Sequence, residues 1–344
     1  MSLDRYGVLK GRVLDHRREP DDDTPHYQIL IDGDGSARAA VNVLSSGQES
    51  DPKMSELLYV AVEDFQHPIL ADLEKLKDGY TELDRKPGGL ALDYIRGSLF
   101  DRTDLRALPA HEPGEDNDLA DVLDHYVTRA QANNGSRIYA FGEPWSAEKE
   151  ADKVFRFKPG RGIHNIHMNQ GNAGRFKGDN GVWQDGALLF HFPAADRWVA
   201  VFLAFQSQKW HTDDRTGGAL PDVPQARPGG QPAEGEPDQR LRIVGALVNA
   251  VGASPEDESV TLINTTTESV DLAGWAIADR DQHQVSLPAR TLAAGETIRI
   301  PVVPPVALGN HGGTITLLDA VGLKVDGVAY TAADATEEGR TVVF

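Results

Sequence analysis

The sequence contains no cysteine among its 344 residues. Disulfide bonds, thiolate metal sites, iron–sulfur clusters and cysteine nucleophiles are therefore excluded, and any metal must be held by histidine, carboxylate or amide oxygen. Long apolar runs are missing too. Stretches such as WVAVFLAF are much shorter than the roughly 18 apolar residues that indicate a membrane-spanning helix, so no membrane span is expected.

Positive charge is scarce, with 34 Lys and Arg against 53 Asp and Glu, a formal net charge of −19 at pH 7. Such a field repels polyphosphates and anionic membranes, which disfavours generic nucleic-acid binding, although a local site can still accept phosphate. The first residues also lack the apolar segment and small-residue cleavage site of a secretory signal. A cytoplasmic location is therefore expected.

The length predicts two domains at roughly 150 residues per domain. The clearest boundary is the segment 217–240, in which prolines 221, 224, 228, 232 and 237 recur among glycines and charges without apolar periodicity. This composition is typical of a semi-flexible linker between domains at 1–216 and 241–344. We expect it to make few contacts and to be cut first by proteases. The alternative is an irregular loop held against one domain.

The region after the linker consists of short β-rich runs separated by turn residues, with no helix-length periodic segment. This pattern predicts an all-β sandwich. The first 216 residues are mixed and predict an α+β domain with an antiparallel sheet. Its strand-like runs lie at Tyr6–Leu14, His26–Ile31, Ala37–Leu44, Glu56–Val62, Ala187–Phe192 and Trp198–Gln208.

The last two of these runs predict a hairpin whose second strand is apolar on both faces and therefore lies inside the fold. A helix is predicted over residues 118–132, because apolar residues recur there with helical spacing. Asp116 or Asn117 can cap its start, and Asn133–Gly135 suits a left-handed exit.

The segment Gly160–Asn172 is the first candidate for a functional site. It combines His164 and His167 with several amides and three glycines, a mixture that suits a polar ligand approached closely by backbone. Asn169 and Gln170 are its predicted ligand-binding amides. The two histidines share a face in a helical turn but point oppositely in an extended segment, so a shared metal is not implied.

Further candidates lie where the predicted hairpin leaves the core: His191, His211, Gln206 and Gln208. Four imidazoles can supply a general acid and base or, with carboxylates, hold a divalent metal; no other cofactor is indicated. Arg96 can bind a phosphate or carboxylate with its fork. The alternatives are structural: His191 in the core, His211 in a turn, the glutamines on a strand emerging into solvent, and Arg96 paired with an acid.

Several motifs of the N-terminal region resemble those of the bacterial YukJ-like family. They include YGVLKGR at 6–12, ALDYIRG at 91–97, IHNIHMNQGN at 163–172, DNGVWQDG at 179–186 and FQSQ at 205–208. The resemblance spans nearly the whole N-terminal domain and implies membership of that family. It supplies no catalytic residue.

The C-terminal region is similar to bacterial lamin-tail domains through VTLIN at 260–264, DLAGW at 271–275, LGNHGG at 308–313 and VDGVAY at 325–330. The similarity implies an immunoglobulin-like sandwich in which Trp275 fills the core. Such domains are often appended to secreted hydrolases and nucleases. The resemblance therefore implies an adaptor with a protein partner, although an export signal is not seen here.

Two hypotheses result. In the first, the N-terminal domain is a hydrolase that uses His164, His167, His191 or His211, with or without a metal, on a polar small molecule or polymer. A phosphodiester is slightly preferred and must be small or locally steered. In the second, the protein is a non-catalytic scaffold or binds sugar or peptide groups through its amides. Convergence of the imidazoles distinguishes the two hypotheses.

Overall fold

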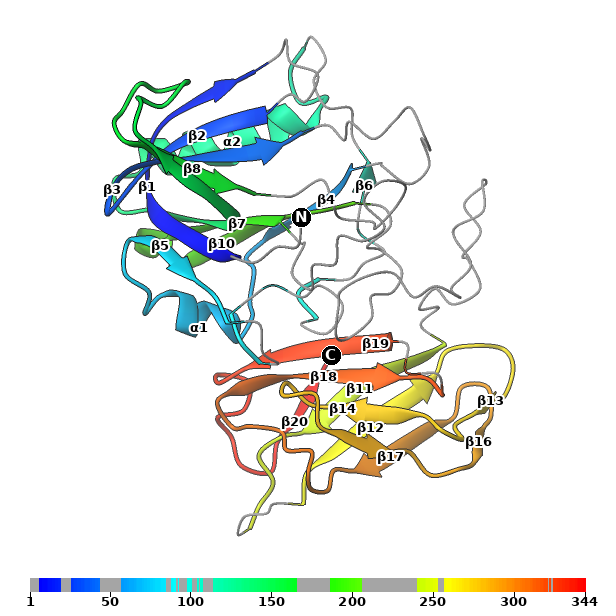
Figure 1. Cartoon of the computed structure of the whole chain (residues 1–344). Coiled ribbons are helices and arrows are strands. Elements are labelled where there is room, and N and C mark those ends of the chain that lie inside the picture. Colours follow the sequence, from blue (N-terminus) through cyan, green and yellow to red (C-terminus); the bar gives the residue numbers. More distant parts are fainter. Residues whose placement is uncertain are drawn as a thin grey trace.

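The computed structural model describes residues 6–19, 26–43, 57–84, 88–90, 92, 98–100, 104, 106–107, 114–165, 186–205, 240–252, 257–320, 322 and 324–344. This described portion is built mostly from strands, with two α-helices, and forms two parts that lie one above the other in Figure 1. No helix in it is long and apolar enough to cross a membrane.

The N-terminal part begins with an antiparallel meander of β1 (Gly7–Arg18), β2 (His26–Gly33) and β3 (Gly35–Asn42). The turn between β2 and β3 places Gly35 at a φ of 79°, a left-handed conformation that glycine adopts without steric cost. The next strand, β4 (Leu57–Glu63), leaves the meander and pairs with β10. The meander therefore ends after three strands.

A ten-stranded sheet has the order β5-β1-β2-β3-β8-β7-β9-β10-β4-β6. Its remaining strands are β5 (Gly79–Glu82), β6 (Arg106–Ala107), β7 (Arg137–Glu148), β8 (Gly160–His164), β9 (Gly186–Phe192) and β10 (Arg197–Phe205). An additional pairing of β1 with β7 closes β1, β2, β3, β8 and β7 into a ring. The first halves of β1 and β7 also belong to the open part of the sheet, so these two long strands join both regions.

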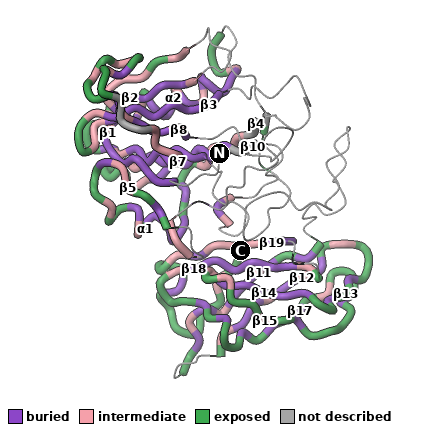
Figure 2. The backbone as a smooth tube through the Cα atoms, in the orientation of Figure 1, coloured by how far each residue is buried: buried purple, intermediate pink, exposed green. Residues whose placement is uncertain are grey.

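Strand β10 supplies side chains to two separate cores. Val199, Val201 and Leu203 pack in the first core, which lies between the ring and α2, whereas Ala200 and Phe202 pack in the second core with α1 (Ile69–Leu73). All five are fully buried, and Figure 2 shows buried backbone along this region. The prediction that a strand apolar on both faces lies inside the fold is confirmed.

The predicted helix is present as α2 (Leu119–Ala132), with its apolar stripe in the first core. Its ends differ from the prediction. Asp118 is the N-cap, and its side chain accepts a 2.8 Å bond from the backbone N–H of Asp121. The helix leaves through Asn133 in an extended conformation, because the Ser136 hydroxyl donates to the carbonyls of Ala130 and Asn133. A left-handed exit is therefore not needed to satisfy these carbonyls.

The C-terminal part is the predicted all-β sandwich. One sheet has the order β17-β12-β11-β20, the other β15-β14-β18-β19, and β13 pairs with β16. The strands are β11 (Leu241–Leu247), β12 (Ser259–Asn264), β13 (Val270–Asp271), β14 (Ala276–Ala278), β15 (Gln284–Ser286), β16 (Thr291–Leu292), β17 (Thr297–Pro301), β18 (Gly312–Leu318), β19 (Lys324–Thr331) and β20 (Thr341–Val343). Trp275 and Tyr330 lie in the core between them.

The two parts contact each other directly near α1 and β19 (Figure 1). Arg280, in the turn between β14 and β15, donates to the carbonyl of Gly88 from Nε (3.1 Å) and Nη2 (2.7 Å), and its Nη2 lies 3.5 Å from Asp72. Lys324 Nζ donates to the Ser98 hydroxyl at 3.1 Å. Residues 217–239 of the predicted linker lie outside the described residues. The parts are thus joined by side-chain contacts as well as by the chain.

Replacing Arg280 by alanine is expected to loosen this contact. The substitution removes charge-assisted hydrogen bonds worth about 1.5 kcal/mol, so the separated arrangement should become roughly ten-fold more populated. Limited proteolysis between residues 206 and 239 should accelerate correspondingly, and small-angle scattering should show a larger radius of gyration. Arg340→Ala, which removes an exposed arginine paired with Glu337 inside the sandwich, is the control. Equal cleavage rates for the two variants would contradict the prediction.

Candidate functional site

The outer surface of the ring carries polar side chains that are nevertheless covered. Along β2 and β3, alternate residues point into the first core and the others point outward. Gln28, Arg38 and Asn42 are on the outward side yet are buried. We use the term polar face for a set of residues on or beside this surface: Glu19, His26, Gln28, Arg38, Trp145, Asp152 and His164.

Arg38 holds the polar face together. Its Nε donates to Asp152 Oδ2 and its Nη1 to Gln28 Oε1, both at 2.7 Å. Gln28 in turn donates from Nε2 to Glu19 Oε2 at 2.6 Å. The Arg38 guanidinium also lies over the Trp145 ring, 4.5 Å from its centroid. A buried guanidinium is tolerated when it is paired in this way, and the pairing fixes the position of the indole.

Asp152 is ionised within this network. Burial by itself raises the pKa of its carboxyl, but the backbone N–H of Phe155, the Arg38 guanidinium and the backbone N–H of Val154 lower that pKa by more. The pKa of Asp152 therefore lies below its ordinary value. The result is a charged pair in the interior, in which Arg38 of β3 reaches Asp152 in the segment between β7 and β8.

Two imidazoles meet at the edge of the polar face. The rings of His26 and His164 make an edge-to-face contact with their centroids 5.1 Å apart, and Trp145 makes a similar contact with His164 at 5.6 Å. Glu19 Oε2 lies 3.9 Å from His26 Nδ1. A carboxylate beside one imidazole and a second imidazole beyond it can orient a base and supply an acid.

Strand register explains why these two histidines meet. His26 pairs with Asn42 of β3, and His164 pairs with Ala40 of the same strand from its other side. Gly162 of β8 lies directly under Trp145, where a Cβ atom would collide with the indole. This glycine of the predicted site therefore makes room for Trp145.

His191 lies elsewhere. It is opposite Arg137 of β7, whereas His164 is opposite Glu143 of the same strand. Six residues of strand separate these positions, or about 20 Å. The structure therefore does not bring His191 and His164 into one site, a question that the sequence had left open.

The environment of His191 is that of a packed side chain. Its ring stacks on Trp198 with centroids 4.3 Å apart, and its Nε2 lies 3.6 Å from Glu74 Oε1. Burial lowers the pKa of His191, and the nearby Glu74 only partly offsets this effect. The structural alternative considered for this residue matches these contacts.

The other predicted site residues all lie outside the described residues: Arg96, His167, Asn169, Gln170, Gln206, Gln208 and His211. In the portion of the chain that the structure does describe, no group of three or more histidine and carboxylate side chains could hold a metal. Asn165, also in the candidate segment, is structural. Its amide donates to the carbonyls of Phe141 (2.9 Å) and Ala187 (3.0 Å), where β7 and β9 diverge.

Sequence reasoning missed His26, Trp145 and Arg38. The sequence carries a weak signal for His26 and Arg38. His26, like Gln28, alternates with apolar residues along β2, and Arg38 is a lone charge among alanines. Alternation of this kind normally indicates a solvent-exposed face. Only the covering of that face by other segments makes these residues part of a site.

Comparison with known proteins shows that the polar face lies within a region matched by a family model. The family described as "Uncharacterized conserved protein (DUF2278)" matches residues 1–217, and the Lamin Tail Domain matches residues 238–332. The "Uncharacterized protein YukJ" of Bacillus subtilis (strain 168) is 46% identical over 218 residues, which make up 62% of this chain and 93% of that relative. The part of that relative outside the match is therefore too short to contain a domain like the sandwich.

Removing the central guanidinium of the polar face should destabilise the fold. Arg38→Ala leaves the carboxylate of Asp152 buried without its charged partner, and we expect the free energy of unfolding to fall by about 3 kcal/mol. Urea denaturation monitored by fluorescence measures this change. Arg12→Ala is the control, because Arg12 makes an exposed ion pair with Asp32 and should cost less than about 0.5 kcal/mol. A loss no larger than that of the control would show that Arg38 is not central.

Asp152 should also make stability depend on pH. Its pKa is lower in the folded than in the unfolded state, so its contribution is present above the unfolded value of about 4 and is lost as the pH falls through the folded value. Asp152→Asn should reduce the slope of stability against pH in this acidic window. The two stability curves should therefore approach each other toward low pH, and parallel curves would contradict the assignment.

Proposed function

Because the chain belongs to the family described as uncharacterized conserved protein (DUF2278), and because the polar face lies in the matched region, we propose that the N-terminal part is a hydrolase whose acid–base groups are His26 and His164. The observation that carries the proposal is the row formed by Glu19, His26 and His164. It places a carboxylate next to one imidazole and a second imidazole within contact distance. Both rings are partly accessible to solvent.

The row supplies the two proton transfers that hydrolysis requires. Glu19 stabilises a positive charge on His26, so His26 is the base that takes a proton from the attacking water. His164, in its protonated form, donates a proton to the leaving oxygen. After one turnover His26 carries the extra proton and His164 lacks one, and exchange with solvent restores both. Trp145 provides an apolar surface beside the reacting group.

The substrate class proposed is a small phosphodiester. A protonated imidazole binds a phosphate oxygen, whereas the net charge of −19 disfavours long polyanions. The segment after His164 contains His167, Asn169 and Gln170, which remain candidates for the same site because they follow within six residues of the sequence. In this proposal the segment 217–240 tethers the sandwich, which acts as an adaptor for a protein partner.

Binding without catalysis is the second candidate, and the stacked Arg38 and Trp145 favour it. An indole held rigidly by a guanidinium, next to imidazole and amide groups, can recognise a sugar or a peptide group without any proton transfer. The buried hydrogen bonds of Arg38 keep this surface preorganised. This function requires the same residues but not titration of His26.

Matched substitutions of histidine by glutamine test the hydrolase. We expect the protein to release p-nitrophenol from bis(p-nitrophenyl) phosphate, and His26→Gln and His164→Gln to slow this release by about 100-fold or more. His125→Gln, which changes an exposed histidine of α2, should remain within about two-fold of the parent.

The outcomes separate the two candidates. Two results together would support binding alone. The protein would not turn over phosphodiester, phosphomonoester or carboxylic ester probes, and the His164 ring signals in NMR spectra would shift when oligosaccharides or peptides are added. Turnover that survives both His26→Gln and His164→Gln would overturn the assignment of these residues.

A further inference from the structure

The connection between β7 and β8 concentrates positive charge in an acidic chain. Five of the thirteen residues from 149 to 161 are lysine or arginine, whereas the whole chain has a net charge of −19. These five residues are Lys149, Lys153, Arg156, Lys158 and Arg161. We use the term basic loop for residues 149–161, which include the first two residues of β8. The loop is drawn in green at the upper left of Figure 1.

The cations of the basic loop are not neutralised by carboxylates in the part of the chain that the structure describes. None of the five makes an ion pair there, and all except Arg161 are exposed. Arg161 donates to backbone carbonyls at the turn between β2 and β3. The two acids of the loop sequence are Glu150 and Asp152, and Asp152 is already paired with Arg38. The loop can therefore attract an anion locally.

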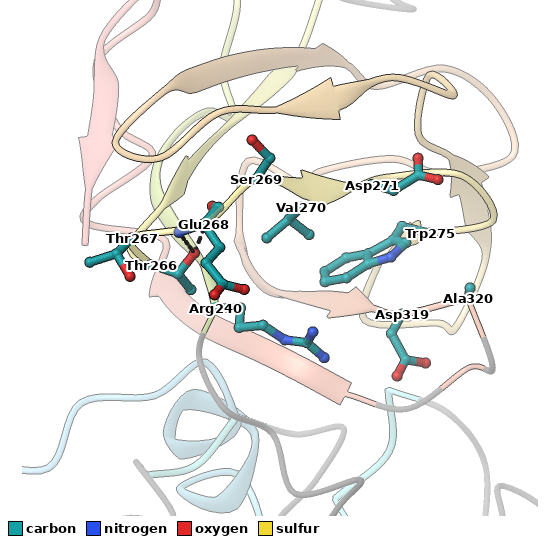
Figure 3. A pocket seen from close by; sticks show the side chains of 10 residues that line it. All are labelled: Arg240, Thr266, Thr267, Glu268, Ser269, Val270, Asp271, Trp275, Asp319 and Ala320. Carbon is teal, nitrogen blue, oxygen red and sulfur yellow. Dashed lines mark hydrogen bonds between the residues drawn. The ribbon is translucent and has the colours of Figure 1, made fainter.

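The pocket beside β13 in the sandwich has the opposite charge. Its lining contains Glu268, Asp271 and Asp319 but a single cation, Arg240 (Figure 3). An anionic ligand is repelled by such a lining. The basic loop of the N-terminal part is therefore the better site for an anion.

Hydrogen bonds within the basic loop fix the shape of its backbone. The Asp152 side chain accepts from the backbone N–H groups of Val154 (3.0 Å) and Phe155 (2.8 Å), and its own N–H donates to the carbonyl of Phe157 at 2.7 Å. Arg156 has a φ of 66°, a left-handed conformation that is uncommon for a residue with a side chain. Such conformations persist where the surroundings impose them, and they cluster at ligand-binding sites.

Two phenylalanines alternate with the cations. Phe155 and Phe157 are both partly exposed. The Arg17 guanidinium of β1 lies 4.9 Å from the centroid of the Phe155 ring and donates to the carbonyl of Val154 at 2.9 Å. Aromatic rings among cations are the combination that binds single-stranded nucleic acids, because bases stack on the rings while phosphates meet the cations. In a duplex the faces of the bases are already stacked on each other.

The basic loop adjoins the two imidazoles of the proposed hydrolase. Arg17, which contacts the loop, pairs with Gln28 and so lies two residues along β2 from His26. At its other end the loop continues into β8, which ends at His164 four residues after it begins, about 13 Å away. A nucleic acid of a few nucleotides can span this distance, since one strand rises by about 3.4 Å per nucleotide.

We propose that the basic loop binds the phosphates of a short single-stranded oligonucleotide and presents one phosphodiester to His26 and His164. The bases stack on Phe155 and Phe157. A short chain suits the site because the cations are confined to one loop, whereas the rest of this acidic protein repels a long polyanion. This inference names the substrate class of the proposed hydrolase and rests on it for cleavage. Binding by the loop does not require the imidazoles.

Fluorescence anisotropy of a labelled thymidylate octamer tests the binding. The full chain carries His26→Gln and His164→Gln, so that the octamer is not cleaved. Adding Lys153→Gln, Arg156→Gln and Lys158→Gln together should weaken binding about 30-fold or more. The slope of log affinity against log salt concentration should become shallower by about two, because each phosphate contact to a single strand contributes about 0.7.

A matched control removes three exposed cations elsewhere. Lys77→Gln, Arg242→Gln and Arg340→Gln, combined, make the same change of net charge outside the loop and should leave the affinity within about three-fold of the parent. An octamer of abasic deoxyribose phosphates should bind at least about five-fold more weakly than the thymidylate octamer, because stacking is lost. Thermal unfolding checks that each variant is folded.

The outcomes distinguish this inference from the hydrolase proposal. Equal binding by the loop and control variants, equal binding of the abasic octamer, or no binding of the octamer would overturn the inference. Polyglutamate that displaces the octamer as well as unlabelled octamer does would also overturn it, since charge alone would then be recognised. Loop-dependent binding by a parent chain that cleaves neither the octamer nor bis(p-nitrophenyl) phosphate would support the binding site and contradict the hydrolase.

Discussion

Pairing between β1 and β7 is the constraint on which the N-terminal part depends. It closes five strands into a ring, so β2, β3 and β8 have no free edge and one side of each strand is committed to the first core. Gly142 of β7 pairs with Gly7 of β1 and also lies against the end of β8, where a Cβ atom would collide with the carbonyl of His164. The same crossing therefore sets the position of the imidazole that ends β8.

The polar face follows from this closure. Apolar residues of β2 and β3 occupy the inside of the ring, so the alternate residues of these strands must lie on its outside. When other segments cover these outward residues, each of their polar groups must be paired. Arg38 meets that requirement with Asp152 and Gln28 and also fixes Trp145. A buried ion pair contributes little net stability, since desolvation offsets its attraction, but it penalises other arrangements. We interpret this network as the device that sets the geometry around His164.

The sandwich is added to an N-terminal unit that occurs without a sandwich in a relative. The Bacillus subtilis relative is covered almost completely by the N-terminal match, so the fold of that region does not require a second domain. In this chain Arg280 and Lys324 nevertheless reach across to Gly88, Asp72 and Ser98. Polar contacts of this kind hold two parts in a defined orientation while each part keeps its own apolar core.

Local patterns in the sequence were sufficient to predict the helices and strands in which buried residues recur with a regular period. The helix at 119–132, the doubly apolar strand β10 and the short strands of the sandwich could all be predicted, because periodicity reports which side of an element is buried. His164 was selected as a candidate from composition alone. Its contact with His26, the separation of His191 and the burial of Arg38 depended on strand register and on covering segments far away in the sequence. Only the tertiary structure decided these features, since pairing between distant strands leaves no local period that a sequence displays.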